Sequence, residues 1–210
     1  YGDRIQTTEA GQRFIFHYPE GETEVRLSVM GIHNVNNAVA ALALACQYDV
    51  PLEGAVRALA DYQPIAMRGV VKEAHGVHII DDTYNASPDS INSNLRALFD
   101  HSPSGGKIAV LADVLELGER SHELHEGIGR FIVEEAEQGR KLSLLVTMGE
   151  ESRAVHDHVA ASSDIPVVHC RDQEEAAQAV RTRMTEGDWI LVKGSRGMHM
   201  DEVVERLTKE

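Results

Sequence analysis

The sequence of 210 residues has few cysteines, few basic residues and no long hydrophobic run, and each shortage excludes a class of protein. Its two cysteines, Cys46 and Cys170, show neither metal-ligand spacing nor a disulfide framework, which fits a reducing compartment. No segment approaches about 18 consecutive apolar residues, and no signal-peptide pattern is present. We therefore predict no membrane span and a cytoplasmic location.

Positive charge is also scarce, since 20 Lys and Arg residues stand against 34 Asp and Glu residues. The formal net charge of -14 would repel a nucleic-acid backbone or an anionic membrane, so neither is expected as a partner. Any anion must be bound locally. The hydrophobic share of 42% is enough for a sizeable core in one large or two modest domains.

The first third of the chain predicts a small sheet followed by two helices. Residues 12–18 and 24–29 alternate in β fashion on either side of a turn signal at 19–22, which indicates a hairpin or a sheet edge. Asn34 is a plausible N-cap for an alanine-rich helix to about residue 48, and Pro51 starts a second helix.

Pro64 and the Arg68-Gly69 pair interrupt this pattern, so we expect a domain boundary near Met67, with domains 1–66 and 67–210. The second domain alternates five strands with five helices, which predicts an α/β fold with a doubly wound, mostly parallel Rossmann-like sheet. The expected strands are 77–80, 107–111, 142–148, 167–169 and 189–193. The expected helices are 87–99, 121–137, one that runs through 159, 174–184 and one from about 198 to the end.

In such a sheet, ligands bind outside the carboxyl ends of the strands. The strand at 77–80 runs into Asp81 and Asp82, and Tyr84 and Asn85 follow before the next helix. The alternative is that the two acids only begin a loop and cap a helix. No GxGxxG fingerprint follows this strand, which disfavours a dehydrogenase-type dinucleotide site.

Two further groups were considered as sites. Ser195 and Arg196, flanked by glycines before a helix, suit an anion or carboxylate, although a simple loop and cap is the alternative. His122 and His125 lie three residues apart on a predicted helix and could bind a metal, but no third ligand is visible nearby. We therefore predict no metal site here.

Several motifs together resemble one family. They are GIHNVNNAVAALALA at 31–45, Arg68, IDDTYNASPDS at 80–90, VLADVLELG at 110–118 and VKGSRGM at 192–198. This series resembles the Mur ligases, the ATP-dependent amino-acid ligases of peptidoglycan synthesis. It is most similar to the member that adds D-alanyl-D-alanine to UDP-N-acetylmuramoyl-tripeptide. Ala112 and Ser87 are mild departures, because the family usually has glycine and asparagine there.

The resemblance implies an enzyme that converts the peptide carboxylate to an acyl phosphate, which the dipeptide amine then attacks. Mur ligases hold ATP with a G-K-[ST] loop and Mg²⁺ with a glutamate and a histidine, beside a carbamylated lysine. None of these motifs is present here. Because Tyr1 also opens within a structured pattern, we expect a fragment. It would comprise the tail of an α/β ATP-binding domain plus the C-terminal domain, and would be inactive alone and monomeric.

The resemblance also assigns residue roles. Asn34 and Asn37, one turn apart, would read adenine; Asp82 would accept both ribose hydroxyls, with Tyr84 and Asn85 beside the nucleotide. Arg68, on the hinge between domains, would reach the γ-phosphate on closure. The candidates for the carboxylate of the dipeptide are Lys193, Ser195 and Arg196. Another Mur-type or folylpolyglutamate-type ligase, or a noncatalytic nucleotide-binding module, remains as an alternative.

Overall fold

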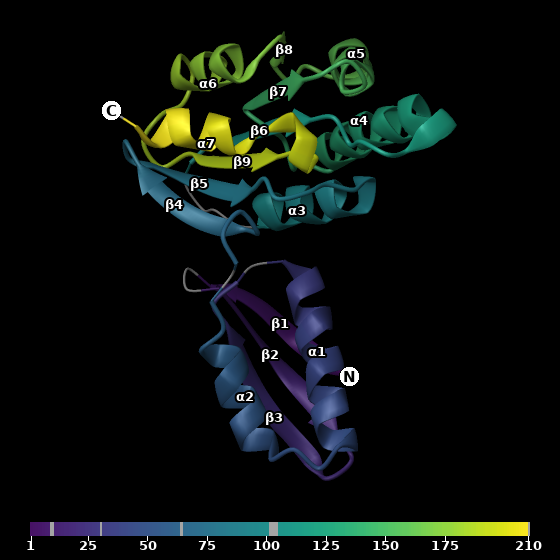
Figure 1. Cartoon of the computed structure of the whole chain (residues 1–210), viewed down its shortest axis with the longest axis vertical. Helices are drawn as coiled ribbons and strands as arrows, with labels where there is room; N and C mark the ends of the chain where they lie inside the picture. The colour runs from purple at the N-terminus through teal and green to yellow at the C-terminus, as the bar shows by residue number, and fades with distance from the viewer. Residues whose placement is uncertain (9–10, 30, 64, 101–104, 210) are drawn as a thin grey trace. The chain divides into compact units, whose positions relative to one another are not determined.

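A computed structural model describes residues 1–8, 11–29, 31–63, 65–100 and 105–209 of the chain. These residues form two compact units, Tyr1–Ile65 and Ala66–Glu210 (Figure 1). The division falls one residue before the predicted boundary, and Pro64, on which that prediction partly rested, lies outside the described residues. Within the described ranges, no helix is long and apolar enough to cross a membrane.

The first unit is a three-stranded antiparallel sheet packed against two helices (Figure 1). Its strand order is β1-β2-β3, so the predicted hairpin is present and one further strand, β1, extends it. Phe14 and Phe16 of β2 point inward with Val25 and Leu27 of β3, as period-2 alternation requires. The elements are β1 Gly2–Thr8, β2 Gly11–Tyr18, β3 Gly21–Leu27, α1 Ile32–Gln47 and α2 Leu52–Ala60.

The start of α1 differs from the prediction. The helix begins at Ile32, so Asn34 lies within its first turn and the prediction that Asn34 caps it is wrong. Gly31 precedes the helix with a φ of 100°, a conformation that side chains disfavour. A Cβ at Gly31 would also lie 2.5 Å from the His33 ring. The turn from strand to helix therefore depends on glycine rather than on an amide cap.

The second unit is an α/β domain built on one six-stranded sheet, which confirms the predicted fold class. The strand order is β4-β5-β9-β6-β7-β8, and every pairing is parallel except that of β4 with β5. The edge strand β4 was missed by the prediction. The strands are β4 Val70–Ala74, β5 Val77–Asp82, β6 Lys107–Ala112, β7 Leu144–Met148, β8 Val167–Cys170 and β9 Trp189–Lys193.

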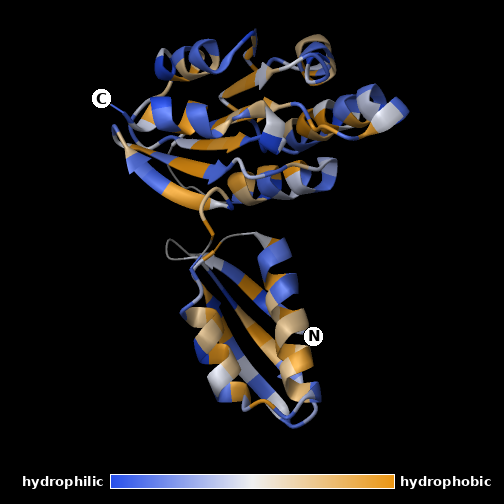
Figure 2. Ribbon diagram, in the orientation of Figure 1, coloured by the Kyte–Doolittle hydropathy of each residue, from blue (hydrophilic) through white to orange (hydrophobic). Residues whose placement is uncertain are grey.

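Helices cover both faces of this sheet, as doubly wound topology requires (Figure 1). One layer consists of α6 and α7, and the other of α3, α4 and α5. Figure 2 shows hydrophobic residues concentrated in the strands of this sheet and a mixture of hydrophilic and hydrophobic residues in its helices. The helices are α3 Pro88–Asp100, α4 Ser121–Glu137, α5 Arg153–Ser162, α6 Gln173–Arg181 and α7 Asp201–Thr208. Short 3₁₀ turns lie at Gly118–Arg120 and Arg196–Met198.

The order of the strands creates a switch in winding direction. Strands β6, β7 and β8 follow one another outward, whereas β9 returns to lie between β5 and β6. The carboxyl ends of β5, β9 and β6 are therefore neighbours at the place where the chain reverses direction. In open α/β sheets this is where ligands bind.

Two boundaries near that edge differ from the predictions. Strand β5 continues to Asp82, so both acids are its last residues instead of the start of a loop. Helix α7 begins at Asp201 rather than near Met198, because the residues before it form a single 3₁₀ turn that ends at His199 in the left-handed conformation. The loop that carries Ser195 and Arg196 is thus longer than expected.

Candidate functional site

Asp82 and Lys193 form the centre of the candidate site. They are register partners at the carboxyl ends of the parallel strands β5 and β9. The Lys193 ammonium donates to Oδ2 of Asp82 and, over 2.9 Å, to the backbone oxygen of Asn85. The amide of Asn94, on α3, donates to the same Oδ2. Donors from β9 and α3 therefore converge on one carboxylate oxygen of β5.

Asp81 has different surroundings from its neighbour. Its side chain is buried and accepts from Lys72 Nζ at 2.8 Å and from Thr83 Oγ1 at 2.7 Å. Lys72 lies on β4, so this pair ties the antiparallel edge strand to β5. Successive strand residues point to opposite faces, which separates the two acids. Asp81 therefore has a structural contact, whereas Asp82 remains partly exposed at the carboxyl edge.

An exposed cationic and aromatic cluster lies beside the Asp82–Lys193 pair. It consists of Arg68, Tyr84 and Arg196. The Arg68 guanidinium lies over the Tyr84 ring at 4.0 Å from its centroid, and that of Arg196 lies at 6.0 Å. The backbone oxygen of Met67 accepts from Tyr84 N at 3.0 Å, which holds the segment before β4 against the loop after β5. Two guanidinium groups close to one ring create a local positive region in an acidic chain, which suits an anion.

Ser195 is held inside the fold rather than presented to solvent. It is only 4% exposed, and its hydroxyl accepts from Leu115 N at 2.8 Å. Its own N–H donates to the backbone oxygen of Asp113 at 3.0 Å. These two hydrogen bonds connect the loop after β9 to the loop after β6. They therefore hold the backbone next to Arg196 in place.

Asp113 organises the same edge from the end of β6. Its buried carboxylate accepts from Ser152 N at 2.7 Å and from Glu151 N at 3.2 Å, just before α5 begins. Asp113 therefore joins the loops that follow β6, β7 and β9. Asp113 lies in the motif at 110–118, but no role was predicted for it from the sequence.

Of the two histidines at 122 and 125, His125 has both ring nitrogens engaged within the fold. His125 is buried; its Nδ1 donates to the backbone oxygen of Ser121 at 2.8 Å, and its Nε2 accepts from Val114 N at 3.0 Å. Neither ring nitrogen of His125 is left for a metal. Within the described parts of the chain, no group of three or more His, Cys, Asp and Glu side chains could hold a metal ion.

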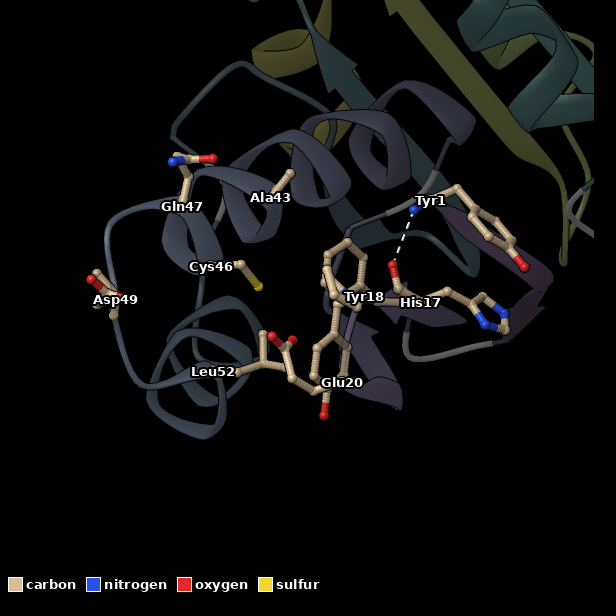
Figure 3. Close-up of a pocket in the computed structure, with 12 residues that line it drawn as sticks. Tyr1, His17, Tyr18, Glu20, Ala43, Cys46, Gln47, Asp49 and Leu52 are labelled. Atoms are coloured by element: carbon tan, nitrogen blue, oxygen red, sulfur yellow. Dashed lines mark hydrogen bonds between the residues drawn. The ribbon is translucent and has the colours of Figure 1, made fainter.

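The two predicted adenine-reading amides lie in the first unit, on the first turns of α1. Asn34 is half-buried with its Nδ2 3.2 Å from His33 Nε2, and Asn37 is exposed. A hollow of about 570 Å³ is found elsewhere in this unit, between β2 and the end of α1 (Figure 3). Neither asparagine lines it, and its lining includes Tyr18, Glu20 and Cys46.

Geometry thus defines a class of protein: an open α/β domain whose switch point presents a carboxylate, a tyrosine and two arginines. Sequence profiles agree and are more specific, since the Mur ligase, glutamate ligase domain matches residues 68–196 and the Mur ligase middle domain matches residues 1–45. The chain belongs to the Mur ligase family.

Two similar proteins indicate which member of that family the chain resembles. The UDP-N-acetylmuramoyl-tripeptide–D-alanyl-D-alanine ligase of Bacillus subtilis is 31% identical over 186 residues, which cover 86% of this chain and 39% of the relative. The Mycobacterium tuberculosis enzyme of the same name is 32% identical over 220 residues, covering 96% of this chain and 42% of the relative. The chain therefore spans about two fifths of the length of these relatives.

Two solved structures with the same fold are of MurF, the short name of this ligase. MurF from Acinetobacter baumannii superposes with a TM-score of 0.87 at 30% identity, covering all of this chain and 44% of that one. MurF from Thermotoga maritima, in complex with ADP, has a TM-score of 0.84 at 27% identity and is covered to 46%. The predicted resemblance to the Mur ligases, and among them to MurF, is confirmed.

Proposed function

We propose that this chain is the C-terminal part of an ATP-dependent ligase that joins D-alanyl-D-alanine to UDP-N-acetylmuramoyl-tripeptide. The product serves peptidoglycan synthesis, and hence cell-wall formation, cell shape and division. Residues 1–66 would complete the central ATP-binding domain, and residues 67–210 would form the C-terminal domain. The names of the relatives support this proposal, and so does the ADP in one similar structure.

The observation that carries the proposal is the presentation of Asp82 at the switch point. An ionised carboxylate accepts hydrogen bonds from two adjacent hydroxyls, as a ribose offers. Lys193 and Asn94 both approach Oδ2, so Oδ1 is the oxygen directed to a ligand. Tyr84 and Asn85, in the loop directly after Asp82, would border the nucleotide, and Asn34 and Asn37 would read adenine.

Arg68 and Arg196 would supply the positive charge. Arg68 stacks on Tyr84 but is exposed, so its guanidinium would be accessible to the γ-phosphate. Negative charge builds up on that phosphate during transfer. Arg196 would bind the carboxylate of the incoming dipeptide, and Ser195 would hold the loop that carries it. The described residues offer no set of ligands for Mg²⁺, so its ligands would come from the upstream part of the enzyme. We also propose a cytoplasmic monomer.

The test of the reaction uses the full-length protein. ATP, UDP-N-acetylmuramoyl-tripeptide and D-alanyl-D-alanine should yield ADP, phosphate and the pentapeptide product, measured by phosphate release and mass spectrometry. L-alanine, D-glutamate, meso-diaminopimelate and L-glutamate should give no product. Turnover with one of these instead would assign another Mur-type or folylpolyglutamate-type ligase. Nucleotide binding with no turnover would favour a noncatalytic module.

The test of the site compares ATP with 2′,3′-dideoxy-ATP. Asp82→Asn removes a charged acceptor, which weakens each hydrogen bond by roughly 1.5–3 kcal/mol, so the preference for ATP should fall by at least about tenfold. The matched control is Asp164→Asn. Asp164 is an exposed acid in the loop before β8 that pairs with Lys141, so this variant should keep the preference for ATP. An unchanged preference in Asp82→Asn would exclude this carboxylate from the ribose.

A further inference from the structure

Lys193 was predicted to bind the carboxylate of the dipeptide, but its surroundings indicate another role. The residue is only 2% exposed, and its ammonium is directed at Asp82 and at the backbone oxygen of Asn85. At this exposure, the ammonium offers little surface for a dipeptide carboxylate to approach. Within the same motif, Arg196 is exposed and able to meet an anion without breaking such a pair.

The contacts of Lys193 fix the two features that the proposed nucleotide site needs. The bond to Oδ2 of Asp82 sets the rotation of the carboxylate, together with Asn94. The bond to the Asn85 oxygen fixes the loop that carries Tyr84.

We propose that Lys193 is a positioning residue for nucleotide binding, acting through Asp82 and the Asn85 loop, and does not contact the dipeptide. This inference rests on the proposed function, because it assumes that Asp82 meets the ribose. It predicts that loss of the ammonium affects recognition of the ribose hydroxyls and leaves the Michaelis constant for the dipeptide unchanged. A role in substrate binding predicts the reverse.

The test replaces Lys193 in the full-length protein with methionine, which keeps the apolar stem but cannot donate. Lys193→Met should reduce the preference for ATP over 2′,3′-dideoxy-ATP in equilibrium binding by about tenfold or more. KM for D-alanyl-D-alanine should change by less than about twofold. Lys107→Met is the matched control, because Lys107 lies at the amino end of β6 and donates to Phe99 O at 2.8 Å. It should alter neither quantity.

A second variant keeps the test decisive if Lys193→Met folds poorly. Asn94→Ala removes the other donor to Oδ2 without leaving a charge unpaired, and should lower the same nucleotide preference while sparing KM for the dipeptide. The proposal would be overturned if Lys193→Met raised KM for the dipeptide about tenfold and kept the preference for ATP over 2′,3′-dideoxy-ATP. Failure of the wild-type protein to use D-alanyl-D-alanine would count against the proposed reaction, whereas the binding ratio would still report on Lys193.

Discussion

Cys170 ends strand β8 in a buried position, and its environment makes it chemically inert. Burial, with smaller contributions from Glu175 and Asp172, raises the pKa of the thiol to about 11. The thiolate is the reactive form, so at pH 8 the reactive fraction should be about a hundredfold smaller than that of a thiol with a pKa of 9. Thiol alkylation should therefore be slow at this residue.

The measurement is alkylation by iodoacetamide at pH 8, followed by peptide mass spectrometry. Cys46, which is partly exposed, serves as the internal reference and should be modified first. Cys170 should react only after denaturant is added, and its rate in the folded chain should rise as the pH increases toward 11. Equal rates in the folded chain at pH 8 would contradict the burial of this thiol.

The residues of the candidate site differ in how far the sequence could identify them. Asp82 and Lys193 each follow an apolar strand, so the pattern placed both at one edge of the sheet. Their pairing depends on β9 lying next to β5, and strand order is a long-range property that local periodicity does not encode. The sequence therefore selected Lys193 for its charge, whereas its burial against Asp82 became visible only in the structure. Asn94 was not predicted, because its bond to Asp82 depends on how α3 packs beside the end of β5, which no local pattern displays.

At the scale of elements, the turn after β7 requires glycine at position 149. Its φ is 116°, and a Cβ there would lie 2.3 Å from Oδ1 of Asp113, which caps the following helix. Gly149→Ala therefore combines backbone strain with a steric clash and should destabilise the second unit by at least about 3 kcal/mol. Thermal unfolding measures the loss.

Gly139 is the matched control for this variant. It also has a positive φ, of 84°, but a Cβ there would meet nothing within 4 Å. Gly139→Ala should cost about 1–2 kcal/mol, the backbone contribution alone. The difference between the two variants isolates the contact with Asp113. Equal losses would mean that the carboxylate moves aside freely and that its cap is weak.

Elements with strong periodicity were predicted well, and the exceptions have physical causes. Helix α4 and strand β9 have the predicted bounds, because each has one clear apolar pattern. Strand β4 was missed because Val70–Ala74 is short, lies at the sheet edge and carries two charged residues. Asn34 is not the cap because Gly31 precedes the helix with a positive φ, a backbone conformation that the sequence does not display.

At the scale of the whole molecule, the second unit should fold without the first. It has its own core on both faces of a complete sheet, and its length is typical of an independent domain. A protein made of residues 66–210 should show a single cooperative thermal transition by circular dichroism. Binding of a hydrophobic dye with a noncooperative melt would instead show that residues 1–65 complete its core.

The position of β9 has a consequence for synthesis of the protein. Strand β9, which fills the middle of the sheet, is synthesised after the other five described strands of that sheet. Until then β5 and β6 each present an edge with no neighbour, and such edges favour association with other chains. The sheet is therefore completed only after all of its other described strands have been synthesised. A premature stop before Trp189 would release two partial sheets, which are substrates for chaperones and proteases rather than a shortened domain.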